Sequence, residues 1–220
     1  ALALVVSFVP GGDVGIAIIV VTILVKLILF PLSMRASRTQ IAMRTLDPML
    51  REIKEKNKDN REVLARETMA LFKEHKVNPF SGFFLILIQI PIILGLYFVF
   101  LGEGSGGSFD ASLLYAFVPV PDVASFSFLG LIDLTGKSMV LAGIVALTQF
   151  FYARLTMPVA PVATGQSLKD DFARSMHIQM RYVFPIVFGF IAFYISAAIA
   201  LYFATSNIFG IVHELVVKRM

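Results

Sequence analysis

The sequence holds few side chains that could perform catalysis, and none stands at the spacing that a known reaction requires. His213 and Glu214 begin like a zinc-binding helix, but the second histidine would have to stand at position 217, where the sequence has Val217. The other histidines, His75 and His177, lie far apart, and no Gly-x-Ser-x-Gly elbow or phosphate-binding glycine loop occurs. We therefore expect no enzyme, no catalytic residue, no metal site and no cofactor.

Lys26 is the side chain that most needs an explanation, because it lies about twelve residues into an apolar run. An ammonium group at the centre of a membrane span costs about 2.5 to 3.5 kcal/mol, a cost that usually marks function. The alternative is that its long side chain snorkels toward Arg35, about 13 Å further along a helix. Thr22 one turn earlier and Ser33 two turns later would form a polar stripe with Lys26, which favours a functional role.

Other apolar runs also carry polar side chains that could face the same interior. We predict a shared polar cavity that adds Gln89, Gln149, Tyr152, Tyr202 and Ser206 to Lys26 and Thr22. For Thr148 and Thr205 we favour the alternative of a hydrogen bond between helices, worth about 0.6 kcal/mol in membranes. We expect no acidic residue in the spans to be placed to neutralise Lys26, and we therefore expect water to reach it from the cytoplasm.

Membrane-spanning helices must position these groups. Of the 220 residues, 57% are hydrophobic and only 15% are charged, which is far more apolar than a soluble domain. A span needs roughly 20 apolar residues. The sequence predicts an all-α membrane protein with five spans, at 14–32, 83–101, 139–157, 182–196 and 197–216, the last two separated near Ser196.

The basic residues predict the topology. Eleven of the nineteen lie between Arg35 and Lys76, and others flank the connection between the third and fourth spans or close the chain. The loop at 102–137 holds only Lys137 against four acidic residues. The positive-inside rule then puts the N-terminus outside and the C-terminus in the cytoplasm, with localisation in the cell inner (plasma) membrane. We favour topology over sequence-specific nucleic-acid binding as the reason for the net charge of +4.

Three segments lie outside the spans. Residues 1–12 read as an interfacial helix, and residues 102–137 as an outer loop with a glycine-rich start. Residues 33–77 are charged but carry apolar residues at helical spacing, with turn formers at 57–60, so we prefer a cytoplasmic helical hairpin to a solvated linker. Its basic side chains are candidate contacts for a partner or for lipid headgroups: Arg51, Lys54, Lys56, Lys58 and Arg61.

Several local strings resemble the signature of the YidC family of membrane protein insertases. They are Val77-Asn78-Pro79-Phe80-Ser81-Gly82, Leu87-Ile88-Gln89-Ile90-Pro91-Ile92 with Leu96-Tyr97, Phe128-Leu129, Asp133-Leu134, Phe184-Pro185, Leu201-Tyr202 and Ser206-Asn207. The resemblance implies a five-helix insertase core at 13–220 that also acts as a chaperone. In this family a hydrophilic, positively charged groove receives nascent membrane proteins and releases them laterally into the bilayer. Lys26 stands where the family usually has an arginine.

The resemblance also implies partners, namely nascent membrane proteins and membrane lipids, together with the ribosome and a Sec-type translocon. Two other readings stay open. A small-solute or ion transporter could use the same polar cavity, although no inverted repeat is visible. A purely structural subunit of a larger complex would leave Lys26 unexplained.

Overall fold

The computed structural model describes residues 2–58, 60–78, 81–101, 124–157 and 175–219, and it is mostly helical, as predicted. The first part of the predicted outer loop, residues 102–123, lies outside the described residues. In chain order the elements are α1 (Leu2–Val6), η1 (Pro10–Gly12), α2 (Val14–Ile28), α3 (Phe30–Lys56), α4 (Arg61–Glu74), α5 (Ser81–Leu101), β1 (Ser127–Phe128), β2 (Ile132–Asp133), α6 (Met139–Thr156), η3 (Gln179–Val183), α8 (Phe184–Ile195) and α9 (Ala197–Val217).

Contacts divide the chain into two compact units. The first, called here the helical unit, contains the residues up to Ile28 and Ile92–Val216. The second, called here the hairpin unit, contains Leu29–Pro91 and the few residues from Val217 onward.

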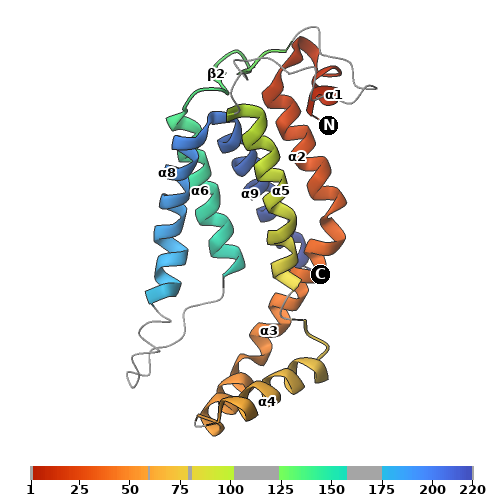
Figure 1. Ribbon diagram of the computed structural model, residues 1–220, viewed down its shortest axis with the longest axis vertical. Helices are drawn as coiled ribbons and strands as arrows, with labels where there is room; N and C mark the ends of the chain where they lie inside the picture. Colours follow the sequence, from red (N-terminus) through yellow and green to blue (C-terminus); the bar gives the residue numbers. More distant parts are fainter. Residues whose placement is uncertain (1, 59, 79–80, 102–123, 158–174, 220) are drawn as a thin grey trace. The chain divides into compact units, whose positions relative to one another are not determined.

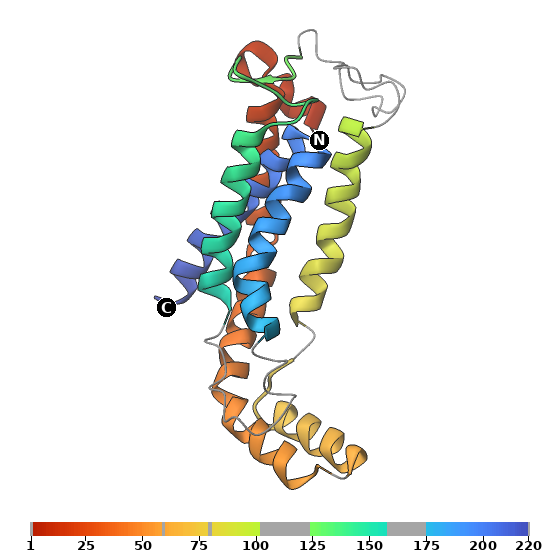
Figure 2. The same ribbon diagram turned by 90° about the vertical axis from the view of Figure 1, so that its left-hand side faces the viewer.

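The helical unit is built around α6 and α8, which pack along each other and lie side by side in both views (Figures 1 and 2). Its buried core is apolar and draws Ile18 from α2, Val145 from α6 and Leu201 from α9. Outward-facing apolar side chains on α6 and α8, such as Leu147 and Phe190, expose more than half of their surface. An apolar surface this large on both sides of the core indicates contact with lipid.

Three helices in the described part of the chain are long and apolar enough to cross a membrane. They are α6, the helix Ser175–Ile195 that contains η3 and α8, and α9. A fourth is obtained if Val14–Ile28 and Phe30–Met43 are counted as one broken span. The protein is therefore an all-α, multi-pass membrane protein.

The first predicted span does not run unbroken from residue 14 to residue 32. Its helix is interrupted at Leu29, with α2 ending before this residue and α3 beginning after it. Pro31 lies in the first turn of α3. Because proline has no N–H to donate to the carbonyl of Leu27, and its ring clashes with that carbonyl, a continuous helix is disfavoured here.

The predicted separation of the last two spans near Ser196 is confirmed, since this buried residue has extended backbone angles (φ −168°, ψ 159°) between α8 and α9. The N–H groups of Ala197 and Ala198 donate to the carbonyls of Gly136 and Leu134, at 2.8 and 3.1 Å. These first N–H groups of a helix have no partner within it. The loop before α6 therefore holds the corner in place.

A short turn fixes that loop. Asp133 accepts hydrogen bonds from the hydroxyl and the backbone N–H of Thr135, at 2.7 and 2.9 Å. These bonds hold the pKa of the Asp133 carboxyl below its usual value. Because the folded-state pKa is lowered, their contribution to stability is present above the ordinary carboxyl pKa and is lost as pH falls through the lowered value.

Asp13 anchors the start of α2. Its carboxylate accepts the N–H groups of Gly15 and Ile16 at 2.7 and 3.0 Å and, from the distant β1–β2 turn, the N–H of Leu129 at 2.7 Å. The side chain is buried, and a parallel bridge between Asp13 and Ser125 adds to the connection. One side chain thus caps a helix and ties a loop to it.

We expect Asp13→Ala to lower the free energy of unfolding by about 3 kcal/mol, because a helix cap is lost and a partly buried N–H is left without its acceptor. Thermal unfolding in detergent measures this change. Asp13→Asn, which keeps one carbonyl oxygen for the cap, should fall between the alanine variant and the wild type. An unchanged melting temperature for Asp13→Ala would contradict the anchoring role.

The hairpin unit contains α3 and α4, which contact each other. Asn60 caps α4, as its side-chain oxygen accepts the N–H of Val63 at 3.1 Å. The amide of Asn57 donates to the carbonyl of Ile53 at 3.0 Å and to the carboxylate of Glu67 at 2.7 Å. The predicted turn between two helices at 57–60 is thereby confirmed for its described residues.

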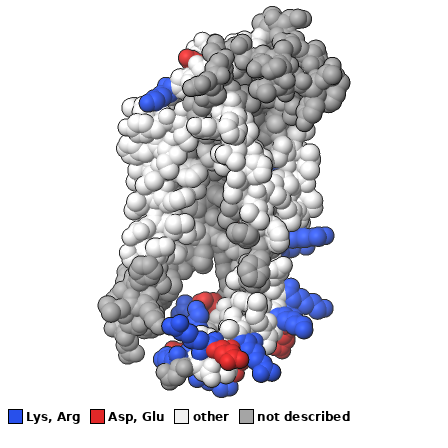
Figure 3. All heavy atoms as spheres, viewed as in Figure 1, with Lys and Arg blue, Asp and Glu red and all other residues white. Residues whose placement is uncertain are grey.

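Charge is distributed unevenly between the two units. Figure 3 shows blue and red side chains gathered over α3 and α4, while the described surface of α6 and α8 is almost entirely white. Charged helices α3 and α4 in the same chain as the apolar helices α6 and α8 are the pattern expected when only the apolar helices lie in lipid.

Candidate functional site

The predicted site begins on α2 with Lys26 and Thr22. Thr22 is buried, and its hydroxyl donates to the carbonyl of Ile18 at 2.6 Å, the usual way in which a helix satisfies a threonine among apolar neighbours. Lys26 lies one turn later, in the last turn of the helix, and is half-buried. Its side chain takes part in further interactions, and its charge acts on the ring of His213 in α9.

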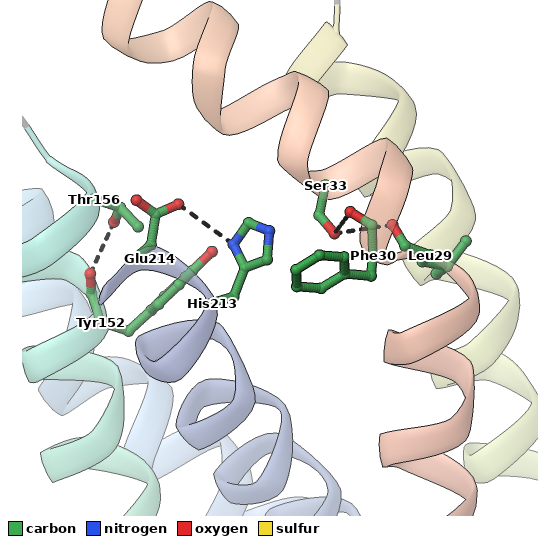
Figure 4. A network of polar contacts seen from close by, with 7 residues as sticks. All are labelled: Leu29, Phe30, Ser33, Tyr152, Thr156, His213 and Glu214. Carbon is green, nitrogen blue, oxygen red and sulfur yellow. Dashed lines mark hydrogen bonds and ion pairs between the residues drawn. The ribbon is translucent and has the colours of Figure 1, made fainter. Parts of the chain in front are cut away.

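His213 and Glu214 form the acidic part of the same cluster. Both are buried in the last turns of α9, and the ring nitrogen Nδ1 of His213 lies 3.9 Å from a carboxylate oxygen of Glu214 (Figure 4). Both residues belong to the helical unit, as Lys26 does.

Tyr152 brings α6 into the cluster. Its ring lies against Gly210, one turn before His213, so closely that an added Cβ on the glycine would lie 2.7 Å from the ring. Figure 4 shows its side chain directed toward His213 and Glu214, and the charge of Glu214 acts on its hydroxyl. Its backbone carbonyl accepts the hydroxyl of Thr156 at 2.9 Å.

The sequence analysis expected no acidic residue in the spans to be placed to neutralise Lys26, and that stays a prediction. The structure shows that one acidic residue, Glu214, lies buried in the apolar helix α9. The sequence analysis considered His213 and Glu214 only as an incomplete zinc motif. The available signal was the pair of ionisable residues inside a run long enough to span a membrane.

Ser33, predicted to extend the polar stripe of α2, lies instead on α3 in the hairpin unit. Its hydroxyl donates to the carbonyls of Leu29 and Phe30, at 2.9 and 3.2 Å (Figure 4). These bonds satisfy the side chain next to the interruption at Leu29. The stripe on α2 therefore consists of Thr22 and Lys26.

The other predicted groove residues are found in different surroundings. Gln149 is half-buried on α6, and Tyr202 is buried in the apolar core. The hydroxyl oxygen of Ser206 is buried and has no hydrogen-bond partner among the described residues. Gln89 belongs to the hairpin unit by its contacts. All the predicted groove residues except Gln89 thus lie in the helical unit, and a cavity that they share stays a prediction.

Two threonines were expected to make hydrogen bonds between helices. Thr148 on α6 does so, since the amide of Asn207 on α9 donates to its hydroxyl at 3.3 Å. Thr205 does not, because its hydroxyl donates within α9 to the carbonyl of Leu201 at 2.8 Å. A hydroxyl that returns to its own helix adds little to the association of two helices.

The basic residues of the hairpin unit are exposed and lie around the turn between α3 and α4. Arg51 pairs with Asp47 one turn earlier at 2.9 Å, but both side chains are about half exposed, so the pair contributes at most about 1 kcal/mol. The remaining candidates for contacts are Lys54, Lys56, Lys58 and Arg61. Among the described residues, no group of three acidic, histidine or cysteine side chains could hold a metal ion.

The chain was compared with known proteins. The sequence model of the 60Kd inner membrane protein family matches residues 5–220. Membrane protein insertase YidC of Oceanobacillus iheyensis is 32% identical over 210 residues, covering 93% of this chain and 74% of the relative. The protein of the same name from Clostridium tetani is 29% identical over 211 residues, covering 96% and 84%. That from Francisella philomiragia is 30% identical over 208 residues, covering 94% of this chain but 33% of the longer relative.

These matches extend over nearly the whole chain, including α2, α6 and α9, which contribute the polar cluster. The chain belongs to the 60Kd inner membrane protein family, whose members include the YidC membrane protein insertases.

Proposed function

We propose that this chain is a membrane protein insertase and chaperone of the inner membrane. It receives nascent membrane proteins at a hydrophilic groove around Lys26 and releases them sideways into the bilayer. The observation that carries the proposal is the set of polar and ionisable side chains of Lys26, Tyr152, His213 and Glu214, buried or half-buried in helices whose outer faces are apolar. Ionisable side chains inside a membrane cost free energy, so they are rarely found there without a function.

The mechanism needs no covalent chemistry. A polar or acidic flank of a substrate that crosses bare hydrocarbon loses its hydration without compensation, which costs several kcal/mol. Polar groups held part-way through the bilayer lower this cost, and Lys26 attracts acidic side chains. A sufficiently apolar segment then leaves toward lipid, where it is more stable.

The proposed topology has five spans, with the N-terminus outside and the C-terminus in the cytoplasm. The fifth span beyond those already described is α5, whose 21 residues are long enough to cross. The charged hairpin formed by α3 and α4 then lies in the cytoplasm, where its basic residues meet lipid headgroups, the ribosome or a Sec-type translocon. Its exposed lysines and the net basic charge of the chain support this orientation.

Depletion of the protein from cells tests the function. Insertion of a short single-span substrate, followed by protease protection, should fall on depletion and return when the chain is supplied again. A small-solute or ion transporter that used the same polar groups would leave insertion unchanged while its solute flux fell. Unchanged insertion would therefore overturn the proposal.

We also expect deletion of residues 52–66 to reduce insertion strongly while the helical unit keeps its stability. The deletion removes the end of α3 and the start of α4, which belong to the hairpin unit. The melting temperature of the helical unit should stay within about 2 °C of the wild type, which corresponds to less than 1 kcal/mol. Growth complementation measures function, and thermal unfolding measures stability.

A second variant separates charge from shape in the hairpin unit. Replacing Lys54, Lys56 and Lys58 by glutamine keeps both helices and removes three exposed positive charges. If the unit acts through basic contacts, this variant should lose function as the deletion does. Full growth complementation by the deletion variant would refute a functional role for the unit.

A further inference from the structure

The turn between β1 and β2 exposes two leucine side chains at one end of the helical unit. Leu129 and Leu131 are 60% and 85% exposed. Figures 1 and 2 show this hairpin of strands at the end of the unit where α6 begins and α8 ends. A single exposed apolar residue needs no explanation, but neighbouring ones that form a patch indicate a binding surface.

The turn is held in place by the rest of the helical unit. The ring of Phe128 packs so closely on α2 that it leaves no room for a Cβ on Gly15. Leu134, which follows β2, is fully buried, and the N–H of Leu129 donates to the buried carboxylate of Asp13 at 2.7 Å. A packed backbone, and not a loose loop, therefore exposes the two leucines.

The backbone of this turn disfavours a leucine. Leu129 and Gly130 have positive φ angles of 53° and 68°, and the N–H of Leu131 donates across the turn to the carbonyl of Phe128 at 3.0 Å. Tight hairpin turns of this kind favour Asn, Asp or Gly, and a bulky apolar residue at positive φ is uncommon. The turn keeps its leucine despite this cost, which favours an apolar environment around the side chain.

A lysine lies over aromatic rings at the same end of the unit. The ammonium nitrogen of Lys137, just before α6, lies 5.0 Å from the centre of the Tyr194 ring and 5.9 Å from that of Phe193, both at the end of α8. Lys137 and Tyr194 are exposed. A tyrosine at a membrane interface lies at the level of the headgroups, where a lysine can extend its ammonium group to lipid phosphates.

The patch is continuous with the lipid-facing surface of α6 and α8. Met139 and Val140, the first two residues of α6, are strongly exposed, and so is Phe190, one turn before Tyr194 on α8. A soluble partner protein would have to bind across this boundary with lipid. The position and the positive charge of Lys137 therefore favour lipid as the occupant.

We propose that this end of the helical unit is anchored in one leaflet of the bilayer. Leu129 and Leu131 enter the boundary between headgroups and acyl chains, and Lys137 binds the phosphate of an anionic lipid. The anchor fixes the depth at which α6 begins and α8 ends. It needs only the multi-pass architecture and does not depend on the proposed insertase function. Under the proposed topology the leaflet is the outer one.

Tryptophan fluorescence tests the position of the turn, because the chain contains no tryptophan of its own. Leu131→Trp is placed in nanodiscs that each hold one copy of the full chain, with lipids brominated at a shallow or a deep acyl carbon as quenchers. The shallow bromines should remove more of the emission, because an interfacial side chain lies about 5–10 Å into the boundary of headgroups and acyl chains. Leu147→Trp, at an exposed leucine in the middle of α6, is the matched control and should show the reverse order.

Tyr194→Trp tests the lysine, since tryptophan keeps a ring under the cation. In nanodiscs, brominated phosphatidylglycerol should quench this tryptophan more strongly than brominated phosphatidylcholine at the same mole fraction. Lys137→Gln should remove the difference, whereas Lys137→Arg should keep it. Added inorganic phosphate should leave the difference unchanged, which distinguishes a lipid site from a site for free phosphate.

Three results would contradict the proposal. Quenching of Leu131→Trp by acrylamide in the water, but by neither brominated lipid, overturns the anchor. Shielding of this tryptophan from all quenchers overturns it as well, because protein would then cover the turn. Equal quenching of Tyr194→Trp by the two lipids overturns the role of Lys137. All of these readouts are independent of insertion, so a failure of the proposed insertase function would leave them unchanged.

Discussion

Lys26→Glu should nearly abolish insertion of substrates with acidic flanks, whereas Lys26→Arg should keep it. The glutamate variant replaces a positive charge by a negative one at a half-buried position of α2. Removing the attracting charge and adding repulsion should lower the insertion rate of an acidic substrate more than about tenfold. Protease protection of that substrate in proteoliposomes measures the effect.

Two controls separate binding from folding. Lys26→Arg keeps a positive charge at the same place, although its guanidinium has a different shape and hydrogen-bonding pattern. A matched substrate with neutral flanks reports whether Lys26→Glu still folds and inserts. Equal insertion of the acidic substrate by wild type and Lys26→Glu would rule out a role of the lysine charge.

Several elements could be predicted from local sequence because their causes are local. Long apolar runs predicted α6 and α9 to within one residue at each end. The turn formers at 57–60 predicted a break between two helices, and in the structure the side chain of Asn60 caps α4. The corner at Ser196 followed from length alone, because some 35 apolar residues are too many for one crossing.

Two features were missed for different reasons. The interruption at Leu29 had a local signal in Pro31, which hydropathy counting ignores. The buried pair His213 and Glu214 had a signal in two ionisable residues inside an apolar run, but their surroundings depend on how the helices pack. Periodicity places a residue on a face of its own helix but does not identify the residue that faces it.

The second large effect is a loss of stability, expected from a substitution at the contact between α6 and α8, where small residues face each other. We expect Gly189→Leu to lower the free energy of unfolding by about 3 kcal/mol or more, as overpacking of a tight contact does. A Cβ at Gly189 would lie 2.9 Å from the Cβ of Ala146 and 3.1 Å from the carbonyl oxygen of Ala142. Thermal unfolding in detergent or nanodiscs measures the loss.

Gly143 on α6 provides the matched control, since it lies in an apolar helix of the same unit but has nothing within 4 Å of an added Cβ. Gly143→Leu introduces the same side chain into open, lipid-facing space, where a leucine is well tolerated. In membranes, small residues let helix backbones approach where hydrophobic burial gives little driving force. Equal destabilisation of both leucine variants would show that the loss does not come from the close contact of α8 with α6, because only Gly189 lies in that contact.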